Sequence, residues 1–155
     1  MTTLNEQYII RLQNKFWRYS EMKIAELKKE IQALKKENPM HKRVINEIIN
    51  DSENYNGNYQ ERIKARCEDV ARGCSSGVVG SMIYYSDTTA FYKKYKKEIL
   101  KLLKELCDET GCKPWELLRD FDEEDLFCEE VQNQNLLAWF AYEEINNRLY
   151  WLVEE

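Results

Sequence analysis

Apolar residues recur at helical spacing along most of the chain. In residues 24–34, Ile24, Leu27, Ile31 and Leu34 alternate spacings of three and four, the seam of a coiled coil or helical hairpin. The preceding residues are more apolar and more aromatic: Tyr8, Ile9, Leu12, Phe16, Trp17 and Tyr19. We therefore expect one helix from about Asn5 to Asn38, with its first half buried more deeply than its second.

The same periodicity predicts further helices downstream. A helix over 41–50 would fold back on the first, and others are expected from Tyr59, from Thr88 to Thr110, from Pro114 and from Gln132. The apolar stripe of the 88–110 helix comprises Phe91, Tyr95, Ile99, Leu102, Leu103 and Leu106. Gly111 is expected to end that helix in a left-handed conformation. No segment alternates as a strand does, and two prolines in 155 residues favour long helices.

Residues 50–58, NDSENYNGN, are polar or turn-forming apart from Tyr55, which predicts a hinge. The predicted fold is therefore all-α. It comprises an N-terminal long-helix hairpin arm in residues 1–50, capable of pairing two copies as a homodimer, and a compact helical bundle in residues 59–155.

Charge is divided along the chain. Residues 1–104 hold 20 Lys and Arg against 13 Asp and Glu, whereas residues 105–155 hold 3 against 15. This division indicates either two faces with different partners or two halves that fold together and neutralise each other.

Other sequence features narrow the class of protein. No apolar run is long enough to span a bilayer, and the N-terminus lacks the pattern of a signal peptide. The five cysteines are irregularly spaced, without C-x-x-C and with His41 as the only histidine, which favours reduced thiols over a zinc site. We expect a cytoplasmic protein without metal or cofactor.

The stretch GCSSG, residues 73–77, matches the G-x-S-x-G nucleophile elbow. That motif needs a strand before the serine and a histidine after it, and Ser75 has neither. The glycines are instead spaced for one face of a helix, where missing side chains let another helix approach closely. This predicted packing face comprises Gly73, Gly77, Gly80 and Tyr84.

Two charged clusters are candidate binding sites. The acidic patch would dock on a basic protein groove as a mimic of nucleic-acid phosphates, or form a solvated loop. It comprises Asp120, Asp122, Glu123, Glu124, Asp125, Glu129 and Glu130. The lysine face would contact nucleic-acid phosphates, or form the solvated side of an amphipathic helix. It comprises Lys93, Lys94, Lys96, Lys97 and Lys101.

The combination of GCSSGVVGSMIYYSDTTAFYKKY with a later QNQNLLAWFAYEE resembles a family of small proteins encoded by bacteriophages and related mobile elements. The resemblance covers about residues 60–150 and leaves the arm outside. It implies a phage-related setting in the host cytoplasm and brings no catalytic residues with it.

Many small acidic phage proteins inhibit host defence, among them anti-CRISPR proteins. The link to this chain is an analogy that rests on the phage-related setting. The expected function is thus a non-enzymatic inhibitor that binds a host nuclease complex, with a Cas nuclease as first guess. The alternative is a nucleic-acid-binding accessory protein that uses the basic arm and the lysine face.

Overall fold

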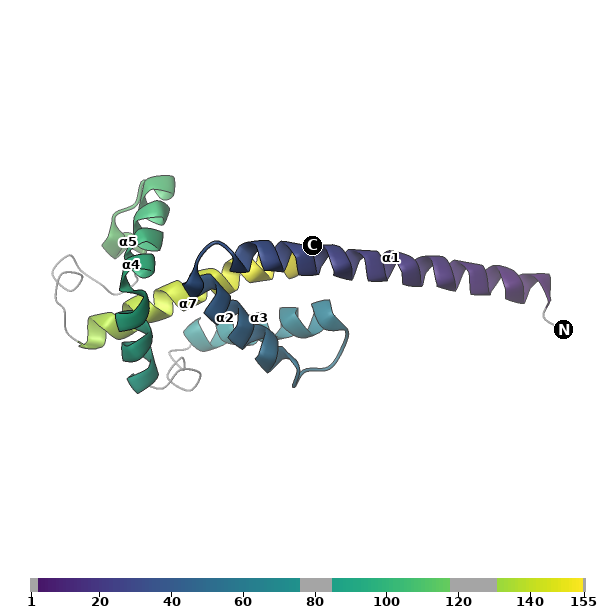
Figure 1. Cartoon of the computed structure of the whole chain (residues 1–155), viewed down its shortest axis with the longest axis horizontal. Helices are drawn as coiled ribbons and strands as arrows, with labels where there is room; N and C mark the ends of the chain where they lie inside the picture. The colour runs from purple at the N-terminus through teal and green to yellow at the C-terminus, as the bar shows by residue number, and fades with distance from the viewer. Residues whose placement is uncertain (1–2, 76–84, 118–130, 155) are drawn as a thin grey trace.

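The computed structural model describes residues 3–75, 85–117 and 131–154, and every element in these ranges is a helix (Figure 1). The all-α prediction is confirmed. The helices are α1 (Leu4–Lys35), α2 (Pro39–Ser52), α3 (Tyr59–Ser75), α4 (Tyr85–Thr110), α5 (Pro114–Leu117) and α7 (Val131–Glu154).

Local sequence signals account for several helix ends. Thr3 and Glu6 form a capping box at the start of α1, each side chain accepting the other residue's backbone N–H. Asn38 caps α2 by accepting the N–H of His41 at 2.8 Å, and Pro39 occupies the first turn. Gly111 has φ 71°, and its N–H donates to the Cys107 carbonyl at 2.9 Å, which confirms the predicted left-handed end of α4.

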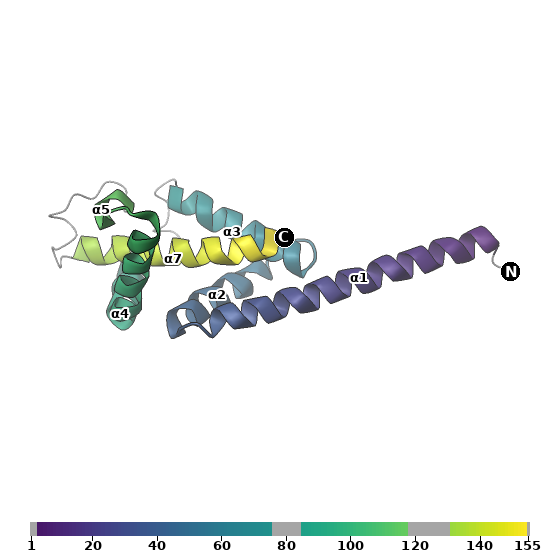
Figure 2. The same cartoon turned by 90° about the horizontal axis from the view of Figure 1, so that it is seen from above.

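Helix α7 is the centre of the bundle. It contacts α1, α2, α3 and α4, and Figure 2 shows it running between α3 and α1 with α4 crossing it. Ile145 and Leu149 of α7 are fully buried, together with Ile45 and Ile48 of α2, Ile63 of α3 and Ile99 of α4. Buried Asn146 of α7 donates to the Cys67 carbonyl of α3 at 3.0 Å, so a polar contact also joins the two helices.

The expected boundary at residues 50–58 does not divide the core. Helix α2 folds back on α1 as expected, but it also packs on α3 and α7. Arg66 of α3 joins α2 to the connecting turn, because its guanidinium donates to Asp51 at 3.1 Å and to the Tyr55 hydroxyl at 3.4 Å. The second half of the predicted arm is therefore part of the bundle.

The expectation that the first half of α1 is the more deeply buried half is wrong. From residue 4 to residue 23, every side chain that the structure describes is exposed, and Leu27 is the first buried one. Leu152, near the end of α7, lies beside Leu27, and residues 4–23 extend beyond the bundle (Figure 2). The rest of the described chain does not reach this half, so its apolar residues have nothing to pack against. We call residues 4–23 the projecting segment.

The predicted stripe of α4 is confirmed, since Phe91, Tyr95, Ile99, Leu102 and Leu103 are buried and Leu106 is partly buried. Helix α4 begins at Tyr85, three residues before the predicted start at Thr88. On α7, Tyr142 is buried, whereas Trp151 is exposed.

Of the predicted glycine packing face, Gly73 lies within α3, while Gly77, Gly80 and Tyr84 lie outside the described residues. The packing role of this face stays a prediction.

Candidate functional site

The lysine face is a basic surface of α4. Lys93, Lys94, Lys96, Lys97 and Lys101 are all exposed, while the apolar stripe of the same helix packs on α7. The backbone departs from helical geometry at Tyr95, whose ring lies 5.5 Å from the Lys94 ammonium. This arrangement can attract an anionic partner, since exposed ammonium groups on one helix sum their fields.

The predicted acidic patch lies outside the described residues: Asp120, Asp122, Glu123, Glu124, Asp125, Glu129 and Glu130. Helices α4 and α5 precede the acidic patch in the chain, and the end of the bundle that they form is also acidic. There Glu105, Asp108 and Glu109 of α4 and Glu116 of α5 are exposed, and they outnumber the exposed lysines Lys104 and Lys113 beside them. We call these four residues the acidic end.

A cleft of about 370 Å³ lies between the α1–α2 turn, α4 and α7. Lys97 and Lys101 of the lysine face line one side, and Arg148 of α7 and His41 of α2 line the other. Carboxylates of Glu37, Glu98 and Glu105 also line it. The cleft therefore presents cations and carboxylates together, which does not select for an anionic ligand.

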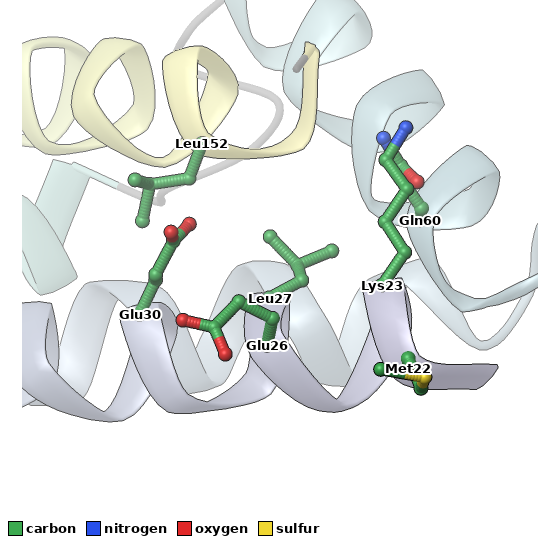
Figure 3. Close-up of a pocket in the computed structure, with 7 residues that line it drawn as sticks. All are labelled: Met22, Lys23, Glu26, Leu27, Glu30, Gln60 and Leu152. Atoms are coloured by element: carbon green, nitrogen blue, oxygen red, sulfur yellow. The ribbon is translucent and has the colours of Figure 1, made fainter. Parts of the chain in front are cut away.

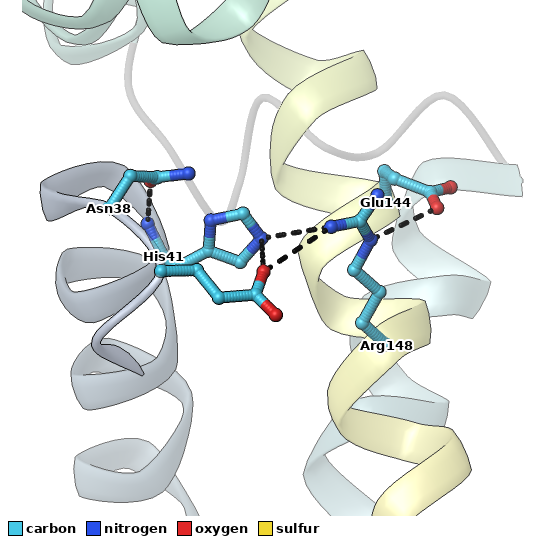
Figure 4. A network of polar contacts seen from close by, with 5 residues as sticks. Asn38, His41, Glu144 and Arg148 are labelled. Carbon is cyan, nitrogen blue, oxygen red and sulfur yellow. Dashed lines mark hydrogen bonds and ion pairs between the residues drawn. The ribbon is translucent and has the colours of Figure 1, made fainter. Parts of the chain in front are cut away.

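The polar network beside this cleft centres on His41 (Figure 4). The imidazole is buried, and the Arg148 guanidinium lies 3.3 Å from its Nε2 and 3.7 Å from the Glu37 carboxylate. Arg148 also donates to Glu144 at 3.5 Å. Because a guanidinium only donates, Nε2 accepts from Arg148 in the neutral imidazole.

Burial lowers the pKa of His41 below its ordinary value of 6.5. Glu37, with its carboxylate 3.6 Å from Nε2, and Glu105 oppose this shift in pKa, while Arg148 reinforces it. His41 is therefore a structural residue held neutral at neutral pH.

This lowered pKa predicts an acid-sensitive stability. As pH falls below about 6.5, the unfolded state takes up a proton at His41 before the native state does, so native stability falls. We expect the unfolding midpoint temperature to drop between pH 7.5 and pH 5.5, and His41→Gln to reduce that drop. Thermal melts across this range measure it. An equal drop in both proteins would contradict the assignment, and Lys42→Gln, an exposed neighbour, is the control.

A second hollow, of about 400 Å³, lies at the base of the projecting segment (Figure 3). Met22, Leu27 and Leu152 supply its apolar lining, and Lys23, Glu26, Glu30 and Gln60 supply its polar lining. Gln60 donates to the Val153 carbonyl at 2.6 Å, which ties α3 to the end of α7 beside this groove. We call it the basal groove.

Cys67, Cys107 and Cys112 are free thiols. Burial raises the pKa of Cys67 to about 12, so its thiol stays protonated and unreactive while the chain is folded. Cys107 and Cys112 are half-buried, and burial also raises the pKa of Cys107. Within the described ranges, no three His, Cys, Asp or Glu side chains gather as metal ligands would.

A family model described as Domain of unknown function (DUF7222) matches residues 26–155. The chain belongs to the DUF7222 family. No curated protein and no solved structure matches it. The DUF7222 match begins at residue 26, so the projecting segment lies outside the family domain, whereas the last part of α1 and all of α2 lie inside it.

Sequence reasoning missed two features of this DUF7222 chain. One is the ion network of Arg148, for which a signal existed, because Arg148 is the only basic residue after Arg119. The other is the basal groove, which residues from α1, α3 and α7 form together. In the part of the chain that the structure describes, no helix is both long and apolar enough to cross a membrane.

Proposed function

We propose that this DUF7222 chain acts by binding a partner protein, without turning over a substrate, and that the partner is a nucleic-acid-processing complex. The resemblance to phage-encoded proteins supports a role as an inhibitor of host defence in the bacterial cytoplasm. A nuclease of the Cas9 type is the first target to test.

The acidic end is the observation that carries this proposal. Its four exposed carboxylates come from the last part of α4 and from α5. Three residues after Leu117, where α5 ends, the sequence enters the acidic patch. A nucleic-acid channel is lined by Lys and Arg, so a concentrated negative surface is complementary to it and competes with the phosphates.

Charge reversal tests the proposal. We expect the wild-type chain to inhibit DNA cleavage by a Cas9-type nuclease. Replacing Asp122, Glu123, Glu124 and Asp125 with Lys should raise the concentration for half-inhibition at least about tenfold, because close charge pairs at interfaces are worth at least about 1.5 kcal/mol. Cleavage assays over a range of inhibitor concentrations measure it.

The matched control reverses four exposed carboxylates elsewhere: Glu21, Glu53, Glu68 and Glu154. It carries the same net charge and should inhibit as the wild type does. Full inhibition by the 122–125 variant would refute binding through the acidic patch. Thermal melts of both variants separate a lost contact from a lost fold.

A second candidate function is nucleic-acid binding through the lysine face, favoured by the exposure of all five of its lysines on α4. Filter binding at increasing salt distinguishes the two candidates. Phosphate contacts give an affinity that falls steeply with salt, whereas no retention of DNA or RNA at low salt would remove this candidate.

A further inference from the structure

The exposed apolar side chains of this protein concentrate on the projecting segment. Among the described residues, the structure exposes eight large hydrophobic side chains, and six of them lie in the projecting segment. They are Leu4, Tyr8, Ile9, Ile10, Leu12 and Met22, with exposed fractions from 48% to 85%.

Five of these six share one face of the helix. At about 100° per residue, Leu4, Tyr8, Ile9, Leu12 and Met22 fall within an arc of about 140°, and Ile10 lies outside it. We call these five residues the α1 stripe. The seam from Ile24 to Leu34, which faces the bundle, is turned by roughly 100° from the stripe. The stripe is therefore centred on a different side of α1 from the seam, and the two meet where Ile9 lies in line with Leu27.

An unsupported helix of this length needs a partner. Residues 4–23 extend about 30 Å at 1.5 Å per residue, and they project from the bundle in both views (Figures 1 and 2). In water, such a helix takes most of its stability from packing of its apolar face, because propensity alone is marginal. Burying the stripe would supply that stability.

We propose that the α1 stripe pairs with the same stripe of a second copy of this chain, with the two helices antiparallel. If the two-fold axis passes level with Lys15, Tyr8 of each copy lies beside Met22 of the other. Leu12 of each copy then lies nearest the centre of the contact, and Ile9 lies next to Tyr8, farther from the axis. The two bundles then lie at opposite ends of the pair.

The basal groove fits the end of the partner helix in this arrangement. Leu4 of one copy lies level with residue 26 of the other, next to the apolar lining of Met22, Leu27 and Leu152. The N-terminal end of a helix carries a partial positive charge, and Glu26 and Glu30 of the groove are complementary to it.

Sedimentation equilibrium of the full chain tests the pairing. At about 100 μM we expect the wild type to have twice the mass of one chain, and Ile9→Glu with Leu12→Glu to have the mass of one. The control, Gln7→Glu with Asn14→Glu, makes the same charge change at exposed positions on the opposite face and should remain a dimer. A monomeric wild type, a dimeric I9E/L12E or a monomeric control would each refute the proposal.

A charge pair tests the antiparallel direction. Tyr8→Glu and Met22→Lys, made singly, should each raise the dimer dissociation constant about tenfold. Made together, they should bring it back to within about threefold of the wild type, because the carboxylate introduced at position 8 then faces the ammonium introduced at position 22 of the other copy. Failure of the double variant to recover would refute this arrangement.

The same samples test other occupants of the stripe. A wild-type monomer that sediments with phosphatidylglycerol vesicles would assign the stripe to a membrane surface and refute self-pairing. None of these outcomes depends on nuclease inhibition, so this proposal and the proposed function fail separately.

Discussion

Leu149→Ala should lower the free energy of unfolding by about 3–5 kcal/mol, the upper part of the range for a buried leucine. Leu149 is fully buried on α7, the helix that contacts α1, α2, α3 and α4. Leu149 belongs to the core cluster that α2, α3 and α4 share with α7, and close packing there limits how far the cavity can relax. Because domains of this size are stable by only about 5–15 kcal/mol, a large share of the native stability would be lost.

Urea denaturation followed by circular dichroism measures this loss. Trp151→Ala is the matched control, since Trp151 lies two residues away on the same helix and is 66% exposed. It should change stability by less than about 0.5 kcal/mol. Equal losses in the two variants would contradict the central position of Leu149.

Ile31→Ala should cost about 2–4 kcal/mol, whereas Ile10→Ala should cost less than about 0.5 kcal/mol. Both isoleucines belong to α1, but Ile31 is 1% exposed and Ile10 is 48% exposed. Ile31 packs into the core cluster, while Ile10 lies in the projecting segment and off the α1 stripe. The pair therefore separates burial from helix propensity within one helix.

Urea melts of both variants at low protein concentration measure this difference while limiting any effect of association. A loss at Ile10 equal to that at Ile31 would show that the projecting segment packs on the bundle. A negligible loss at Ile31 would show that the seam of α1 does not contribute to the core.

The sequence predicted the helices well because their signals are local. The apolar stripe of α4, the left-handed end at Gly111 and the fold-back of α2 on α1 each depend on residues a few positions apart. The extent of the core was predicted less well. The composition of residues 50–58 is typical of a domain boundary. Arg66, which follows this turn, nevertheless donates hydrogen bonds to Asp51 and Tyr55, 15 and 11 positions earlier.

The candidate sites also differ in how far local sequence signals predict them. The exposure of the lysine face follows from its helical spacing, and the structure confirms it. The neutral state of His41 does not follow from spacing, because it depends on burial and on Arg148, 107 positions away. The acidic patch lies outside the described residues, and its role stays a proposal.

The sequence by itself determined that this chain is helical, where most of its helices begin and end, and which sides of α4 are apolar and basic. Only the tertiary structure decided which apolar face is covered. Ile9 and Leu12 are as apolar as the buried Leu27 and Ile31 of α1, but they belong to the projecting segment, which lies beyond the reach of α7 and α2. Apolar periodicity shows that a helix face is stabilised by packing against another surface. The length and path of the other helices decide whether the same chain provides that surface.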